Sequence, residues 1–208
     1  MIKIVFENIA NSNIKIYNIS RFKQGKEKLL NLSTKEIKDL REYINIVKPI
    51  IDNPEVQKMK NFRQHYDTSC FEHCLHVSLI SYYIGKHLGL DYVSMARAGM
   101  LHDFFLYDWR DPDRHQVKGF FNKHAFTHGL IAYRKAKIYF TINRCERDII
   151  INHMWPVTVR LPRYKETYIV TLVDKYCALY EARLNFVMRI QDSFIAKKLN
   201  MGKEEEKS

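Results

Sequence analysis

Two adjacent side chains that can bind a metal ion, His102 and Asp103, follow a run of apolar and small residues at 93–101 that predicts a helix. If that helix is buried, both side chains need partners, because an unpaired buried carboxylate is very costly. A single bound cation would serve both of them. A helix end at the protein surface, with His102 capping it, explains the pair equally well.

Three other predicted helices each place a histidine or an aspartate among apolar residues. His73 lies one turn into its helix, His153 follows a run of three isoleucines, and Asp174 lies on an apolar stripe. Taken singly, a histidine on such a stripe is more often a hydrogen-bonded core residue than a metal ligand. Together with the adjacent pair, however, four separate helices contribute such side chains, and this indicates a shared buried cation.

Three capping boxes mark the starts of helices that position these side chains. In each box a Ser or Asn is followed three residues later by a Glu, at Ser33 and Glu36, Ser69 and Glu72, and Asn143 and Glu146. The first of these helices is expected to stop at Pro49 and the second at Gly89. Pro54 and Asp91 predict two further helix starts, and the helix after Asp91 runs into His102.

The remaining chain predicts helices at about 126–140 and 143–153, and a long last helix that starts near Tyr164. The apolar stripe of this last helix is expected to consist of Ile169, Leu172, Val173, Tyr176 and Leu179. These elements predict an all-α fold with one helical domain at 33–200. Residues 1–32 are expected to form an N-terminal appendage, as a hairpin or a loose arm, and 201–208 a charged tail.

Length and composition favour one globular domain outside the membrane. At 208 residues the chain suits a single well-packed core. No apolar run approaches the roughly 18 residues of a membrane span, and the apolar N-terminal patch is too short for a signal peptide. The cysteines Cys70, Cys74, Cys145 and Cys177 form no CxxC pair and are expected to be reduced core residues. We therefore expect a cytoplasmic protein.

The net charge of +11 favours anionic partners, such as phosphate esters, nucleotides and nucleic acids. Lys and Arg are spread along the chain rather than gathered in one arm, which favours a general positive field over a dedicated nucleic-acid surface. Solvated lysines without any partner account for the charge equally well.

Five segments, taken in their order along the chain, resemble the HD-domain metal-dependent phosphohydrolase superfamily. They are EHCLHVS, LHD, a histidine that opens a helix, NHMWP and LVDKY. The signature of that family is an isolated His, an adjacent His-Asp pair and a distant Asp, which match His73, His102, Asp103 and Asp174. Members with two metals add two histidines, and His128 and His153 stand at those positions. The resemblance covers about 67–181 and implies an HD-type helical bundle.

The chain departs from the family pattern around the fourth ligand, His128. Many relatives have a proline after this ligand, whereas Gly129 follows His128. His124 lies one turn before His128, so that an i, i+4 histidine pair is a rival arrangement. Phe126, two residues before His128 as in relatives, favours His128 as the ligand and leaves His124 as a residue of the pocket.

The ligand set that the resemblance implies, four histidines and two aspartates, suits one or two ions of Fe, Mn, Co, Ni or Zn rather than Mg or Ca. Asp103 has two carboxylate oxygens and can bridge two cations. A water bound between two metals has its pKa lowered from about 15.7 to about 7, so that hydroxide can attack phosphorus near neutral pH. The resemblance thus implies a phosphohydrolase that cleaves a phosphate ester or anhydride.

Basic residues that flank the ligand segments are candidates to hold the phosphate groups of a substrate, for which nucleotides are the leading class. They are Arg114, Lys118, Lys123, Arg163, Lys165 and Lys175, with His124 as a further pocket residue. Trp109 and Trp155 can stack on a base. The ordinary alternative is a solvated surface position for each basic residue and a place in the core for each Trp.

The segment 104–119 is long for a connection between helices, which usually has about 2–8 residues. Its aromatic and basic residues favour a cover over the substrate. A surface loop that carries a few aromatics into the core explains the segment equally well.

Two other function classes stand beside the enzyme. A nucleotide-binding sensor would keep the fold and the metal but turn over little, although a complete ligand set argues against a decayed site. A basic nucleic-acid-binding helical protein would explain the charge and leave the histidines and aspartates as coincidence. Bound metal separates the last class from the other two, and turnover separates those two.

Overall fold

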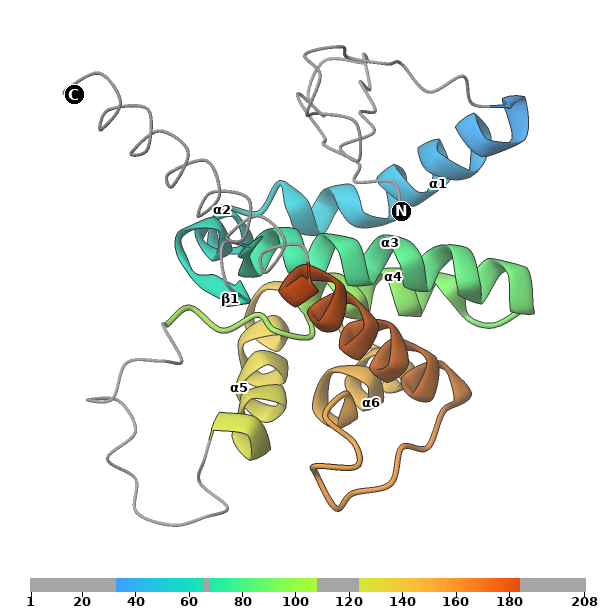
Figure 1. Cartoon of the computed structure of the whole chain (residues 1–208). Helices are drawn as coiled ribbons and strands as arrows, with labels where there is room; N and C mark the ends of the chain where they lie inside the picture. Colours follow the sequence, from blue (N-terminus) through green and yellow to red (C-terminus); the bar gives the residue numbers. More distant parts are fainter. Residues whose placement is uncertain (1–32, 66–67, 108–123, 184–208) are drawn as a thin grey trace, which may run out of the picture. The chain divides into compact units, whose positions relative to one another are not determined.

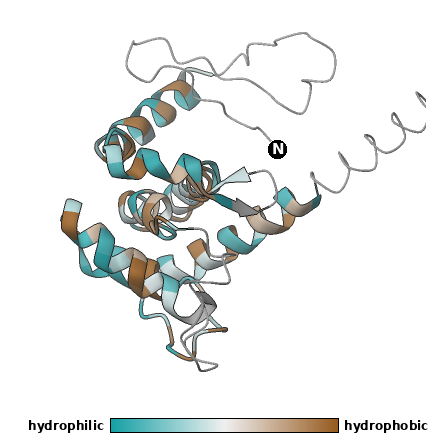
Figure 2. Cartoon of the chain, turned by 90° about the vertical axis from the view of Figure 1, so that its left-hand side faces the viewer, coloured by the Kyte–Doolittle hydropathy of each residue, from teal (hydrophilic) through white to brown (hydrophobic). Residues whose placement is uncertain are grey.

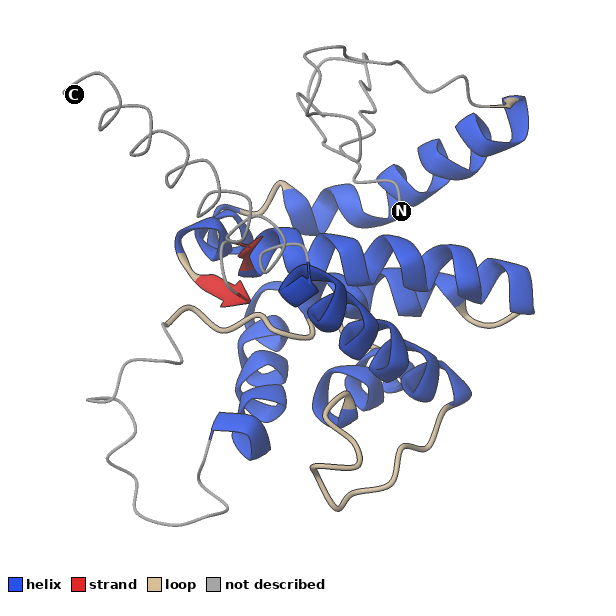
Figure 3. Ribbon diagram, viewed as in Figure 1, coloured by secondary structure: helices blue, strands red, loops and turns tan. Residues whose placement is uncertain are grey.

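The computed structural model describes residues 33–65, 68–107 and 124–183 of the chain, and its fold is all-α, as the sequence predicts (Figures 1 and 3). The chain divides into two compact units, 1–42 and 43–208, and the first helix spans the boundary between them. The predicted appendage at 1–32 and the predicted tail at 201–208 lie outside the described residues. Their domain bounds therefore stay predictions.

The described part of the chain consists mainly of helices. They are α1 (Thr34–Ile51), α2 (Pro54–Gln57), the 3-10 helix η2 (Lys58–Asn61), α3 (Cys70–Leu88), α4 (Tyr92–Leu101), α5 (His124–Tyr139), α6 (Arg144–Asn152) and a last helix over residues 165–183. A small antiparallel pair, β1 (Arg63–His65) and β2 (Thr68–Ser69), stands before α3. This pair was not predicted from the sequence.

The predicted starts of α3 and α6 are confirmed by their capping hydrogen bonds. The backbone N–H of Glu72 donates to the Ser69 hydroxyl, and the Glu72 carboxylate accepts from the Ser69 backbone. Asn143 and Glu146 make the same reciprocal pair at the start of α6. Gly89 ends α3 in the left-handed conformation, with a φ of 66°, which favours glycine.

The prediction that Pro49 ends the first helix is wrong, because α1 continues to Ile51. A proline inside a helix removes one backbone hydrogen bond and crowds the preceding turn. Here the last turn is kept by a hydrogen bond from the Asp52 N–H to the Lys48 carbonyl. Ile50 and Ile51, which follow the proline, are both buried, and their burial offsets the lost bond.

The predicted stripe of the last helix is wrong for three of its five residues. Leu172, Tyr176 and Leu179 are 64%, 51% and 72% exposed. The buried face instead runs through Val170, Val173, Asp174, Cys177 and Glu181. Two of these side chains are carboxylates that bond to His73 on α3, so polar partners select the face that is buried.

The helices of the larger unit carry both hydrophobic and hydrophilic residues along their length, as amphipathic helices do (Figure 2). α3 lies along α4 (Figure 1). A Cβ on Gly99 of α4 would lie 2.8 Å from the Ser78 Cα on α3, so only glycine permits this approach. The Ser78 hydroxyl also donates to the Ala96 carbonyl at 2.6 Å. The approach fixes the end of α4, where His102 and Asp103 lie.

The buried carboxylate of Asp148 anchors the start of the last helix to α6. One oxygen accepts from the Asn152 amide at 2.7 Å. The other accepts from the backbone N–H of Arg163 at 2.9 Å, the backbone N–H of Tyr164 at 3.3 Å and the Thr167 hydroxyl at 2.7 Å. Asp148 therefore positions the helix that carries Asp174.

Asp148→Ala is expected to lower the free energy of unfolding by about 3 kcal/mol, because it strands several donors that each cost about 1–3 kcal/mol when unsatisfied. Thr167→Val, which removes only one of these bonds, is the matched control and is expected to cost about 1 kcal/mol. Urea denaturation measures both. An Asp148→Ala effect no larger than that of Thr167→Val would contradict the anchoring role.

The four cysteines are buried free thiols, which confirms them as core residues. Within the ranges that the structure covers, no helix is long and apolar enough to cross a bilayer.

Candidate metal centre

Six buried side chains from five helices converge in the larger unit. They are His73 on α3, His102 and Asp103 at the end of α4, His128 on α5, His153 at the end of α6, and Asp174 on the last helix. All six are the residues that the sequence analysis named as metal ligands. His73 and His102 are fully buried, and Asp174, the most exposed of the six, is only 9% exposed.

His102 and His153 occupy equivalent positions, each as the residue that caps the end of a helix. The Nδ1 of His102 lies 2.8 Å from the Gly99 carbonyl, and the Nδ1 of His153 lies 2.9 Å from the Ile150 carbonyl. A carbonyl only accepts, so Nδ1 carries the proton in both rings. In the neutral rings, Nε2 then presents a lone pair to the centre.

His73 is oriented in the same way by Glu181, a residue that the sequence analysis missed. The Nδ1 of His73 lies 3.1 Å from Oε2 of Glu181, which is 4% exposed. Glu181 also bonds His76 at 3.3 Å. Its position seven residues after Asp174, two helical turns along the same face, is the signal that could have found it.

The first group of donor atoms surrounds one oxygen of Asp174. His73 Nε2 lies 3.0 Å from this Oδ1, and His102 Nε2 lies 3.6 Å from it. The Oδ2 of Asp103 is 3.5 Å from the same His102 nitrogen. His73, His102 and Asp174 can hold a metal ion together.

The second group surrounds the other oxygen of Asp103. His128 Nε2 lies 3.4 Å and His153 Nε2 lies 3.5 Å from this Oδ1. The two ring nitrogens are 2.8 Å apart. His102, Asp103 and His153 can also hold a metal ion together, so that Asp103 faces both groups.

Gly129 explains how His128 reaches this place. A Cβ on residue 129 would lie 2.7 Å from the Ile150 carbonyl oxygen and 2.9 Å from the Ile151 carbonyl oxygen. Only glycine therefore lets α5 approach the end of α6 so closely. The close approach therefore explains the glycine that follows His128.

The chemistry of these donor atoms fits a bound cation. Ligands about 2.0–2.1 Å from a metal lie about 3.0 Å apart in an octahedron and about 3.4 Å apart in a tetrahedron. The separations of 2.8–3.6 Å lie within a few tenths of an ångström of these two values. The Nε2 of His102 is buried and has no hydrogen-bond partner among the described residues. A buried lone pair that faces carboxylates needs a positive charge between them.

The electrostatics of the six side chains and Glu181 show the same need. Burial lowers the pKa of His73, but the hydrogen bonds to Asp174 and Glu181 outweigh it and raise this pKa well above its usual value. Burial also lowers the pKa of His102, but the charge of Asp103 and the interactions with Cys74 and Asp174 together outweigh it and raise this pKa well above its usual value. Burial raises the pKa of Glu181, but hydrogen bonds from His73 and His76 lower it to about 2. The carboxylates of the site thus favour positive charge beside the histidine rings.

Metal binding is therefore expected to release protons and to weaken as the pH falls. The raised pKa values of His73 and His102 keep both rings protonated at neutral pH, and a cation must displace those protons from Nε2. Because about two protons are released on binding, the association constant should fall roughly 100-fold for each unit by which the pH is lowered. Titration calorimetry in buffers of different ionisation enthalpy measures the released protons. An affinity that does not change between about pH 6 and 8 would contradict this linkage.

The residues predicted to bind or stack on the substrate are not among the six metal-binding side chains. The Lys175 ammonium donates to the His153 carbonyl at 3.4 Å, and the Trp155 ring packs edge-on against Tyr168 with 5.3 Å between centroids. Arg163 lines a separate pocket on α6, and Lys165 is exposed at the start of the last helix. Several predicted features lie outside the described part of the chain. They are Trp109, Arg114, Lys118, Lys123, the expected cover beyond residue 107 and the side chain of His124.

The buried histidine and aspartate groups can thus hold a metal ion. No family model, curated protein or solved structure matches the chain.

Proposed function

We propose that this protein is a metal-dependent phosphohydrolase of the HD-domain type that cleaves a phosphate ester or anhydride, with nucleotides as the leading substrate class. The observation that carries the proposal is the position of Asp103. Its two oxygens face two different sets of histidines, with His102 on one side and His128 and His153 on the other. This is the arrangement that a carboxylate needs to bridge two cations.

One metal ion would be held by His73, His102, Asp103 and Asp174. The other would be held by Asp103, His128 and His153. The mixed nitrogen and oxygen ligands suit Fe, Mn, Co, Ni or Zn. When bound, such ions lower the pKa of a water and neutralise charge on phosphate oxygens.

The chain itself supplies orientation and exclusion of water. The Nδ1 bonds of three histidines to Gly99, Ile150 and Glu181 fix the rings, so that Nε2 of each faces the centre. The burial of all six side chains strengthens the electrostatic interactions within the site. The net charge of +11 raises the local concentration of anionic substrates.

A screen of the metal-loaded protein against phosphomonoesters, phosphodiesters and nucleotides tests the proposal. We expect phosphate release from at least one class, and its loss when the metal is chelated. Bound metal without turnover on any substrate would favour a nucleotide-binding sensor instead. Absence of both metal and turnover would favour a basic nucleic-acid-binding protein.

A further inference from the structure

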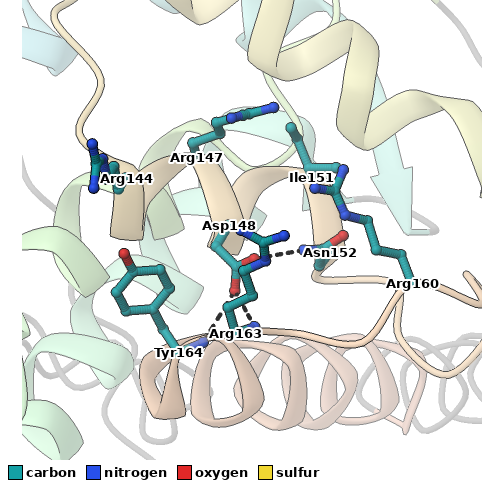
Figure 4. A pocket seen from close by; sticks show the side chains of 8 residues that line it. All are labelled: Arg144, Arg147, Asp148, Ile151, Asn152, Arg160, Arg163 and Tyr164. Atoms are coloured by element: carbon teal, nitrogen blue, oxygen red, sulfur yellow. Dashed lines mark hydrogen bonds between the residues drawn. The ribbon is translucent and has the colours of Figure 1, made fainter.

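A second polar pocket, of about 240 Å³, lies beside α6 and the connection that leads to the last helix (Figure 4). Four arginines line it: Arg144 and Arg147 from α6, and Arg160 and Arg163 from the connection. On α6, the lining residues Arg144, Asp148 and Ile151 recur at helical spacing, on the face opposite to His153. The pocket is therefore separate from the metal centre.

The charges of these arginines are not balanced within the pocket. Among the residues that the structure describes, none of the four guanidinium groups forms an ion pair with a carboxylate. The carboxylate of Asp148 lies in the pocket, but its oxygens accept from neutral donors: an amide, a hydroxyl and two backbone N–H groups. The Arg147 guanidinium lies over the Tyr133 ring, 5.5 Å from its centroid. The guanidinium groups of Arg144, Arg160 and Arg163 remain against one carboxylate, which makes the pocket strongly attractive to a multiply charged anion.

Asn152 adds an independent sign of a ligand. This residue lines the pocket and is only 2% exposed, and its Oδ1 has no hydrogen-bond partner among the described residues. Its Nδ2 donates to Asp148, which fixes the amide and turns the oxygen away from that carboxylate (Figure 4). A buried acceptor without a partner is costly, so a hydroxyl or amino group of a ligand is expected to bond it.

We propose that this pocket binds the phosphate groups of a small, multiply phosphorylated molecule that also carries a hydroxyl or amino group. Ligand pockets that enclose a whole drug-sized molecule have about 300–1,000 Å³. The smaller volume here, 240 Å³, suits the charged end of the ligand. The bidentate geometry of arginine favours phosphate over simple anions. This site does not depend on the proposed hydrolysis.

Titration calorimetry with inorganic tripolyphosphate and with a non-hydrolysable nucleoside triphosphate analogue tests the proposal on the metal-loaded protein. The pocket variant is Arg144→Gln/Arg160→Gln. The matched control is Arg134→Gln/Arg183→Gln, which removes the same charge from two exposed arginines that do not line the pocket. The metal content of each sample is measured before and after titration, so that a change at the metal centre is recognised separately.

We expect the pocket variant to bind tripolyphosphate about 100-fold more weakly, since each lost charge-assisted hydrogen bond contributes about tenfold. The control should stay within about threefold of wild type. The nucleotide analogue should bind more tightly than tripolyphosphate, and Asn152→Ala should remove this difference. Equal weakening in both double variants would overturn the proposal, because net charge alone would then attract the anions. An analogue that binds no more tightly than tripolyphosphate would overturn the role of Asn152.

Discussion

Asp103→Asn is expected to lower phosphate release by about 10³-fold and to reduce the bound metal. The substitution keeps the size of the side chain but removes the charge that faces both histidine groups. The contribution of metals to the stabilisation of charge in the transition state is several kcal/mol, and 1.36 kcal/mol corresponds to a factor of ten in rate. Elemental analysis and steady-state kinetics measure the two effects.

Asp52→Asn is a suitable control for this variant. Asp52 is an exposed aspartate whose carboxylate pairs with Lys48 at 2.7 Å, away from the six ligands. It should keep its metal and its rate. An Asp103→Asn protein that folds, binds the wild-type amount of metal and turns over at the wild-type rate would show that Asp103 bridges nothing.

Removal of the metal is expected to lower the melting temperature by about 10 °C. The ligands come from five helices, and a cation that binds only the folded state stabilises it by mass action, by about 4 kcal/mol at 1,000 times the dissociation constant. For a chain of this size, 1 kcal/mol corresponds to roughly 2–4 °C. Differential scanning calorimetry with and without a chelator measures the shift.

Restoring the metal should restore the original melting temperature, which separates this effect from damage by the chelator. Superimposable melting curves for loaded protein and verified metal-free protein would mean that the metal does not join the helices.

Local signals allowed most of the fold to be predicted from the sequence. Capping boxes are decided within four residues, so that the starts of α3 and α6 were predicted correctly. The end of α1 was not, because burial of Ile50 and Ile51 outweighs the local effect of Pro49. The buried face of the last helix was also misjudged. Hydropathy favoured Leu172 and Leu179, whereas partners on α3 select the face with Asp174.

In the candidate site, too, some residues were predicted from the sequence and others were missed. Five of the six residues lie on apolar stripes or after apolar runs and were visible in the sequence, whereas His128 was named from the family resemblance. The structure brings all six together. Glu181 was missed, because its partner His73 lies 108 residues away in the chain. The arginine pocket was missed too, since nothing in the sequence shows that Arg144 and Arg160 line one cavity or that Asn152 is buried beside them.

The most direct test of the metal centre is the number of metal ions per chain, measured by elemental analysis of the purified wild type and of His128→Ala. His128 contributes only to the second group of donor atoms, with Asp103 and His153. We expect up to two transition-metal ions per wild-type chain and the loss of one in the variant. A single metal ion in both proteins would contradict the dinuclear centre, and no metal in the wild type, after it has been offered Fe, Mn, Co, Ni and Zn, would contradict the metal centre itself.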